Sequence, residues 1–286
     1  MSLFLIGMRN KREFSIEIET SMEVLNLSSE GLEEIDLTPL SNCKELQELR
    51  LGSNKLRIIN LKPLENCANL RVLDLRDNQL VKVDLAPIKK CYKLEEIYLQ
   101  NNFLVDIDIK LLCKNTQLRI LNIDFNLLKN VELNSKSEWI YLKEIRMSNN
   151  NLKNINLEAL RYSKNLREID FGNNLLTKIN LEPLSRCAKV KSIAIERNKI
   201  KEVDLRIFNE KIEPFVLCTD PKVKFKWGEK QRTKDKTMIV YSSGNHYTKK
   251  QQEAIEKYWS EERKERERRR KRIVLEEQKK TMPFNY

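Results

Sequence analysis

The chain has 286 residues, of which 40% are hydrophobic and 34% are charged, so it can bury a sizeable core beneath a very polar surface. Its formal net charge is +12, and most of this excess lies after residue 205. The apolar start over residues 3–6 is too short to span a membrane and lacks the order of a secretory signal. We therefore expect no membrane protein, and we expect residues 1–21 to form an N-terminal cap with a strand at Phe14, Ile16 and Ile18.

A frame of 24 residues then repeats eight times over residues 22–207, with no insertion or deletion. Its pattern is L-x-x-L-x-L-x-x-N-x-L-x-x-I-x-L-x-x-L-x-x-C-x-x, and the second copy carries it as Leu46, Leu49, Leu51, Asn54, Leu56, Ile59, Leu61, Leu64 and Cys67. This pattern resembles the leucine-rich repeat family, intracellular type. The resemblance implies an α/β solenoid with a curved parallel β-sheet on its concave face.

The positions of the frame have physical reasons of their own. In each copy the L-x-L segment alternates apolar and polar residues, which predicts a short strand with one face inward. One copy cannot bury its leucines alone, so the copies must stack around a shared core. The Asn column is expected to bond backbone groups where the chain turns. Prolines at 39, 63, 87 and 183 predict short helices or turns on the convex side.

Metal, cofactor and catalytic sites find little support. Cys43, Cys67, Cys91 and Cys187 share one frame position, which favours buried packing over metal binding and suits a cytoplasmic, reducing location. The Asp/Asn column could suggest a calcium ladder, but such residues more often close turns. The one histidine, His246, has no catalytic motif around it, so we predict no enzyme, no metal and no cofactor.

We expect the function to depend on the variable positions of the frame, whose side chains project from the concave sheet. Large apolar groups at nominally exposed positions, surrounded by charges, are typical of a protein-binding hot spot, although some of them could instead pack against neighbouring loops. The candidate protein-binding residues are Val72, Asp74, Arg76, Tyr98, Phe103, Ile120, Phe125, Leu127 and Arg146.

Two further segments follow the repeats. Residues 208–247 are predicted to form a C-terminal cap with a β-hairpin, built from the alternating run 222–227 and the apolar run 238–241. Residues 248–286 are predicted to form a basic charged helix and tail, with Thr248 and Gln251 as a capping box and Ile255, Tyr258 and Trp259 docking the helix. Its charged run is either a solvated helix or a polyanion-binding arm, for which the candidates are Arg266, Arg268, Arg269, Arg270, Lys271 and Arg272.

The family resemblance implies an interaction module, since leucine-rich repeat proteins are mostly scaffolds. We therefore predict a non-catalytic scaffold that binds a partner protein on its concave face and uses the basic helix as a second contact. RNA, an anionic membrane and an acidic protein are all compatible with that helix. The alternative is a ribonucleoprotein component in which the repeats hold a protein and the basic arm holds RNA.

Overall fold

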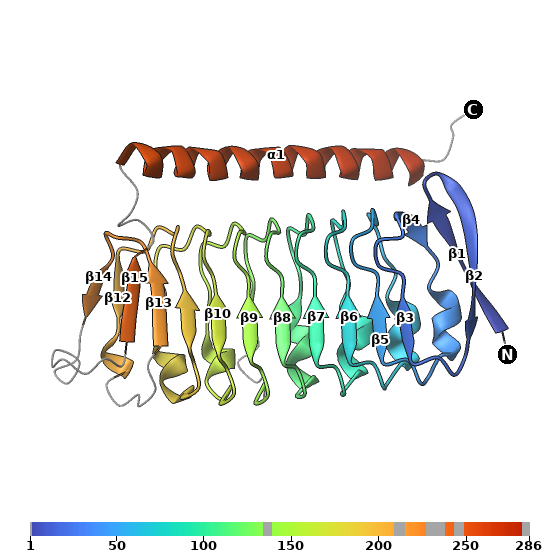
Figure 1. The fold of residues 1–286 in the computed structure, drawn as a ribbon, viewed down its shortest axis with the longest axis horizontal. Helices are drawn as coiled ribbons and strands as arrows, with labels where there is room; N and C mark the ends of the chain where they lie inside the picture. The colour runs from blue at the N-terminus through green and yellow to red at the C-terminus, as the bar shows by residue number, and fades with distance from the viewer. Residues whose placement is uncertain (1, 134–138, 209–214, 227–237, 243–248, 282–286) are drawn as a thin grey trace.

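The computed structural model describes residues 2–133, 139–208, 215–226, 238–242 and 249–281, apart from the side chains of residues 2, 238–242, 249–259, 262 and 279–281. Its dominant element is a parallel sheet of 10 strands (Figure 1). From one end to the other the strands are β3 (Val24–Asn26), β5 (Glu48–Arg50), β6 (Val72–Asp74), β7 (Glu96–Tyr98), β8 (Ile120–Asn122), β9 (Glu144–Arg146), β10 (Glu168–Asp170), β11 (Ser192–Ala194), β13 (Phe215–Thr219) and β15 (Met238–Ser242).

The register of this sheet follows the repeat. From β3 to β13, each strand residue pairs with the residue one frame later, as Leu49 does with Leu73 and Leu73 with Ile97. The middle residue of each of these strands is buried, and its two neighbours project to the other side, which we call the sheet face. The predicted solenoid of stacked parallel strands is confirmed.

Short 3₁₀ helices lie on the opposite side of the stack (Figure 1). Four of them have proline at their first or second position, as predicted for the convex side. The Asp/Asn column closes the turn before most of them, as when Asp84 Oδ1 accepts the Ala86 N–H at 2.9 Å, so the turn interpretation is confirmed. The helices are η1 (Thr38–Asn42), η2 (Lys62–Asn66), η3 (Ala86–Lys90), η4 (Ile109–Lys114), η5 (Glu158–Leu160), η6 (Glu182–Arg186) and η7 (Arg206–Phe208).

The Asn column ties each repeat to its neighbours. Asn78 Nδ2 donates to the carbonyl of Leu51 at 2.9 Å and to that of Leu75 at 3.2 Å, while its Oδ1 accepts the Leu56 N–H at 3.0 Å. Backbone groups that would otherwise be buried without partners are thereby satisfied. The same bonds recur at Asn54, Asn102, Asn126, Asn150, Asn174 and Asn198, which confirms the predicted role.

The cysteine column is a packing column. All six cysteines are free, and Cys43, Cys67, Cys91 and Cys187 are buried in the main core. Burial raises the pKa of the Cys67 thiol to about 11 and that of Cys91 to about 12, because a thiolate is poorly solvated there. Such thiols act as small apolar fillers.

An antiparallel sheet covers the N-terminal end of the stack. Strands β1 (Ser2–Arg9) and β2 (Arg12–Glu19) form a hairpin, and β1 also pairs with β4 (Leu32–Ile35) of the first repeat. The two turn residues Asn10 and Lys11 have φ of 49° and 62°, as in the turns that suit a two-residue hairpin. Leu5 and Ile18 are buried against the first repeat, so β2 contains the strand expected around residues 14–18.

The expected C-terminal hairpin is wrong. Strand β15 pairs in parallel with β13, and β14 (Lys224–Lys226) pairs in parallel with β12 (Glu202–Asp204) in a separate sheet of two strands. Both segments therefore continue the winding of the repeats instead of folding back on each other. Alternation in residues 222–227 indicated a strand correctly up to Lys226, but alternation does not specify the partner strand. Trp227 lies outside the described residues.

A single long helix, α1 (Lys249–Thr281), crosses the top of the stack in Figure 1. It runs from the C-terminal end of the stack back toward the N-terminal end, along the loops that follow the strands (Figure 1). Arg263 Nη2 donates to Asn173 Oδ1 at 2.6 Å, and Arg57 pairs with Glu276 at 2.6 Å, so the helix bridges repeats seven and two. Thr248 and the side chains of Ile255, Tyr258 and Trp259 are outside the described part, so the predicted cap and docking residues stay predictions.

Candidate functional site

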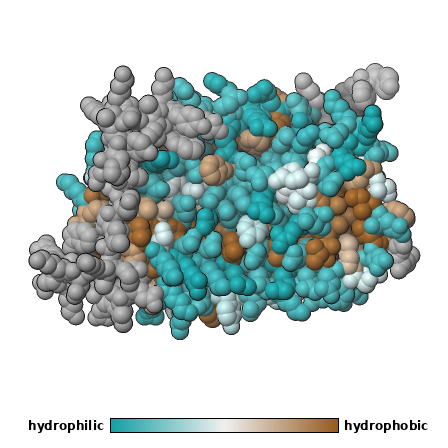
Figure 2. Space-filling view, viewed as in Figure 1, coloured by the Kyte–Doolittle hydropathy of each residue, from teal (hydrophilic) through white to brown (hydrophobic). Residues whose placement is uncertain are grey.

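The sheet face is a polar surface. In Figure 2, which views the molecule from this side, hydrophilic residues cover most of the face, and the larger apolar area lies toward the N-terminal strands. The first and third residues of each strand and the second residue after it supply its side chains. Among the side chains at these positions, carboxylates outnumber cations. The carboxylates are Glu48, Asp74, Glu96, Asp124, Glu144, Glu168, Asp170 and Glu196, and the cations are Arg50, Arg76 and Arg146.

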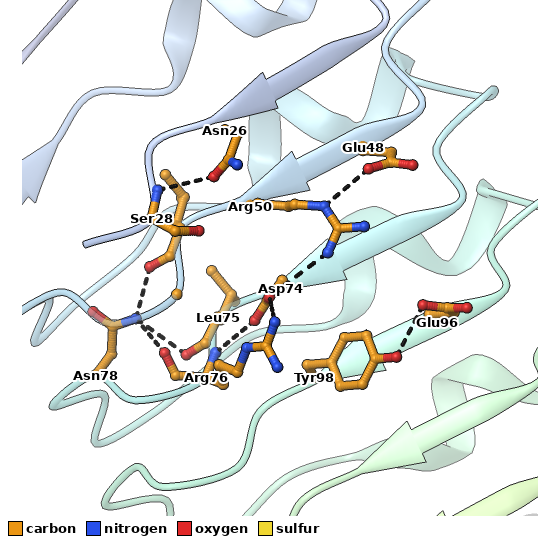
Figure 3. Close-up of polar contacts among 12 residues, drawn as sticks. Asn26, Ser28, Glu48, Arg50, Asp74, Leu75, Arg76, Asn78, Glu96 and Tyr98 are labelled. Atoms are coloured by element: carbon orange, nitrogen blue, oxygen red, sulfur yellow. Dashed lines mark hydrogen bonds and ion pairs between the residues drawn. The ribbon is translucent and has the colours of Figure 1, made fainter. Parts of the chain in front are cut away.

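Repeats two to four carry a network in which each carboxylate has a cation or hydroxyl partner (Figure 3). Asp74 is only 1% exposed, and its Oδ2 lies 2.8 Å from Arg76 Nη2 and 4.0 Å from Arg50 Nη1. The Arg76 guanidinium also lies over the Tyr98 ring, 5.3 Å from its centre. Of the predicted residues, Asp74, Arg76 and Tyr98 are thus brought together.

The same network fixes the tyrosine. Tyr98 OH donates to Glu96 Oε2 at 2.9 Å. Burial, with this hydrogen bond as a second cause, raises the pKa of Tyr98 to about 12. The phenol therefore stays neutral, and the side chain is half-buried. Val72, another predicted contact, is buried at 7% exposed and supports this cluster from within the sheet.

Repeats five to seven hold a second group of charges. Arg146 Nη2 lies 2.5 Å from Glu168 Oε2 and 3.3 Å from Glu144 Oε2, so this predicted residue links two strands. Asp124 is 8% exposed and accepts the Ser148 N–H at 2.6 Å. Burial, followed by the charge of Asp170, raises the pKa of Asp124 to about 7. Ile120, another predicted contact residue, is half-buried and lies on β8, one strand away from Arg146.

The raised pKa of Asp124 makes stability depend on pH. Between about pH 4 and pH 7 the folded chain keeps a proton that the unfolded chain loses, so this group stabilises the fold at low pH and the effect disappears as pH rises through 7. Asp124→Asn removes the titration but keeps an acceptor for Ser148. We expect the variant to gain on the order of 2–4 kcal/mol over the wild type between pH 4 and pH 8. Parallel curves from urea unfolding across this range would contradict the shift.

The expected apolar hot spot is partly covered by the chain itself. Phe103 and Leu127 are 6% and 1% exposed because they pack with Ile273 of α1, and Val81 and Val105 flank this cluster. The expectation that Phe103 and Leu127 are open to a partner is therefore wrong. Phe125 is 39% exposed and has Arg266 6.0 Å from its ring centre. Of the apolar candidates on the sheet face itself, Tyr98 and Ile120 are half-buried and Val72 is buried.

Helix α1 divides the six basic candidates into two groups. Arg266 donates to the carbonyls of Asn102 and Phe125, Arg269 lies 5.2 Å from the Phe103 ring centre, and Arg270 is half-buried. These three face the repeats. Arg269 is nevertheless exposed, as are the other three candidates, Arg268, Lys271 and Arg272. Two of them pair with Glu265, Arg268 at 3.4 Å and Arg272 at 3.2 Å, which reduces the free positive charge.

Sequence reasoning found only part of what holds α1, because the apolar restart at residues 273–275 suggests a contact either with a partner or with the same chain. Ile273 is the first apolar residue after a long charged run, and that position is the available signal for its buried role. The ion pairs of Arg57 with Glu276 and Glu277 could not be predicted, because the chain contains many charged residues of both signs before these glutamates. The sequence thus predicts that the helix docks, and the structure adds the ion pairs that contribute to it.

Neither a metal site nor a membrane-spanning helix is found among the described residues. No three of their His, Cys, Asp or Glu side chains are placed to hold a metal ion. None of the helices in these residues has a stretch long and apolar enough to cross a membrane. His246 lies in a segment that the structure leaves undescribed.

Comparison with protein families agrees with the observed repeat. A model described as "Leucine rich repeat" matches residues 20–80 and 140–200, and one described as "Leucine Rich repeats (2 copies)" matches residues 68–110. No curated protein sequence is significantly similar to the chain.

Several solved structures share the fold. Internalin C2 from Listeria monocytogenes is 19% identical with a TM-score of 0.57, over 71% of this chain and 84% of that one. A chain in the octameric complex of Latrophilin 3, Unc5D and FLRT2 (LRR) is 18% identical with a TM-score of 0.62, over 81% and 73%. The leucine-rich repeat domain of APL1B is 20% identical with a TM-score of 0.53, over 78% and 73%. At these identities the likeness is one of fold.

Proposed function

Because the chain belongs to the leucine-rich repeat family, we propose that it is a non-catalytic scaffold that binds a partner protein through its sheet face. The observation that carries this proposal is the row of half-buried, mutually paired side chains along that face, from Glu48 to Glu168. Such side chains are already held in place, so binding costs little ordering entropy. Among the similar structures, one is a complex of several proteins.

The partner is expected to centre on Tyr98. An aromatic ring held by a guanidinium on one side and a carboxylate on the other is a rigid amphipathic contact of the kind that dominates interface energies. Ile120, on the next strand opposite Glu96, adds apolar area diagonal to Tyr98. The covered Phe103 and Leu127 are left out of this proposed surface.

The proposal predicts a loss of binding without a loss of fold. Tyr98→Ala combined with Ile120→Ala is expected to weaken capture of the main protein partner at least tenfold, because hot-spot residues contribute about 2 kcal/mol or more each. Affinity purification from the native cell identifies the partner, and calorimetry with the purified pair measures Kd. Tyr162→Ala, on an exposed tyrosine outside the sheet face, is the control. Equal binding by both variants, with unchanged melting curves, would remove the sheet face as the binding site.

The exposed side of α1 is the second contact in this proposal. Arg268, Lys271 and Arg272 form a small cationic ridge there, which supports attraction to RNA, an anionic membrane or an acidic protein. A ribonucleoprotein role is the alternative that this ridge favours. In the same assays, changing these three residues to Gln is expected to leave capture by the sheet face intact and to flatten any salt-dependent binding to RNA.

The same proposal places the protein in a reducing, intracellular compartment. All six cysteines are free, and four of them fill the core at one frame position. Free buried thiols are typical of such compartments.

A further inference from the structure

The loops that enter the strands make up one long edge of the stack, which we call the basic edge. In Figure 1 they lie below the strands, opposite α1. Each loop consists of the last four residues of one frame copy and the first two of the next, from residues 66–71 to residues 186–191. Glu95 is the only carboxylate among the described residues of these loops, and Glu138 lies outside the described part. Exposed cations are frequent there: Lys90, Lys114, Lys164, Arg167, Lys189 and Lys191.

Side chains of successive repeats contact one another along the basic edge. Arg71 Nε lies 2.8 Å from Glu95 Oε1, and Arg119 Nη1 lies 2.9 Å from Glu95 Oε2, so one carboxylate pairs with two guanidinium groups and a positive charge remains. Lys189 Nζ donates to Asn165 Oδ1, one frame copy earlier, at 2.8 Å. An ammonium group has three donors, so this lysine is held in place and keeps donors for a further ligand.

Exposed aromatic rings lie between these cations. Tyr92, Tyr141 and Tyr162 are 55%, 49% and 50% exposed, and all three belong to the loops of the basic edge. A lysine follows each of them within two residues along the chain. Cations that contact phosphates, together with exposed rings on which bases stack, are the combination that holds single-stranded nucleic acid. A double helix hides the faces of its bases, so such rings favour a single strand.

Neither of the other two charged surfaces has this combination. On the sheet face carboxylates outnumber cations, which disfavours a polyanion there. On α1 none of the described side chains is aromatic, and Glu265 pairs with two of the exposed arginines. The repeats thus separate acidic and basic side chains onto different surfaces, and the exposed rings accompany the basic ones.

We propose that the basic edge binds single-stranded nucleic acid, with phosphates on its lysines and arginines and bases stacked on Tyr92, Tyr141 and Tyr162. This inference goes beyond the scaffold function and does not depend on it, because a strand bound at this edge leaves the sheet face free for a partner protein. Neighbouring parallel strands lie about 4.8 Å apart, so the cations recur at short intervals along the stack, as the phosphates of one extended strand do.

The charge of the basic edge is tested with fluorescein-labelled oligo(U) and oligo(dT), titrated with the full-length protein while anisotropy is measured at several salt concentrations. The edge variant changes Lys164, Arg167 and Lys191 to Gln. We expect it to bind at least tenfold more weakly at low salt. The slope of log Kd against log salt should fall by about 2 units, because each phosphate neutralised on a single strand contributes about 0.7.

The matched control removes the same charge from the same part of the stack. It changes Lys129, Lys153 and Lys178 to Gln, three exposed lysines of repeats five to seven that lie outside the basic edge. This control should bind nearly as the wild type does, and both triple variants should melt as the wild type does. The Gln variant of the α1 ridge should lose less affinity than the edge variant. Either probe supports the proposal, and the one that binds more tightly identifies RNA or DNA.

A second variant tests the rings. Tyr92→Ala combined with Tyr141→Ala is expected to weaken binding of both probes at least tenfold while the salt slope stays unchanged, because stacking is lost and no charge is removed. Tyr92→Phe combined with Tyr141→Phe keeps the rings and should bind as the wild type does.

Several results would overturn the proposal. They are no binding of either probe at low salt, equal losses in the edge variant and its control, and unchanged binding by the Tyr→Ala variant. A larger loss in the α1 variant than in the edge variant would move the site to α1. Binding of oligo(Glu) as tight as that of the nucleic acids would instead indicate an acidic protein as the ligand of this edge.

Discussion

Leu121→Ala is expected to lower the free energy of unfolding by about 2–5 kcal/mol, the range for removing a fully buried leucine. Leu121 is the middle residue of β8, is 0% exposed, and lies between Ile97 and Ile145 in the ladder. Repeats on both sides hold the site open, so the surroundings cannot collapse into the cavity. Urea unfolding followed by circular dichroism measures the loss.

The matched control for this substitution is Lys129→Ala, an exposed residue of the same repeat, which should change stability by less than about 0.5 kcal/mol. Asn122, the strand neighbour of Leu121, is a poorer control than the sequence suggests. Its Oδ1 accepts the Asp124 N–H at 3.0 Å, so Asn122→Ala is expected to cost about 1 kcal/mol. Equal losses for Leu121→Ala and Lys129→Ala would contradict the assignment of the frame.

Ile273→Asp is expected to release α1 from the repeats. Ile273 is 4% exposed against Phe103 and Leu127, and burying such a side chain contributes about 1.5–3 kcal/mol. An aspartate there adds the cost of a buried charge, while the remaining helix contacts are mostly ion pairs and arginine contacts of partly exposed side chains. We expect amide exchange over residues 263–277 to become at least tenfold faster, measured by mass spectrometry.

Leu275→Asp is the control for the helix. It lies two residues further along α1 and is 55% exposed, so it should leave the exchange near that of the wild type. The cooperative melting of the repeats should survive in both variants, because the cluster around Ile273 is separate from the main core. Equal exchange in the two variants would show that Ile273 does not hold the helix.

The repeats could be predicted from sequence because the same type of residue recurs at each frame position in many copies. Leu49, Leu73 and Ile97 occupy one frame position, so a single argument about an inward strand residue applies to all of them. The role of the Asn column could be predicted for the same reason. A buried amide that recurs at one point of each turn needs the same backbone partners each time.

The structural features that could not be predicted occur only once in the chain and depend on residues that are far away in sequence. From sequence alone, the apolar side chains of Phe103 and Leu127 could be either exposed to a partner or covered by the same chain. The structure shows that Ile273, far away in sequence, covers them. The pairing of β14 with β12 likewise depends on how far the winding continues, which the weakened frame after residue 207 does not specify.

The candidate site was predicted in part for the same reason. Asp74, Arg76 and Tyr98 were found as variable letters of the sheet, but their mutual pairing follows from side-chain conformations.

Helix α1 and the stack of repeats run side by side as two periodic rods of similar spacing. An α-helix advances about 5.4 Å per turn, and neighbouring parallel strands lie about 4.8 Å apart. One helical turn therefore meets roughly one repeat, and the mismatch of about 0.6 Å per turn grows to half a strand spacing after about four turns. The contacts from Arg263 to Glu277 cover about four turns. Helix α1 has 33 residues, and the described contacts fall within the part of it over which the two spacings stay nearly in step.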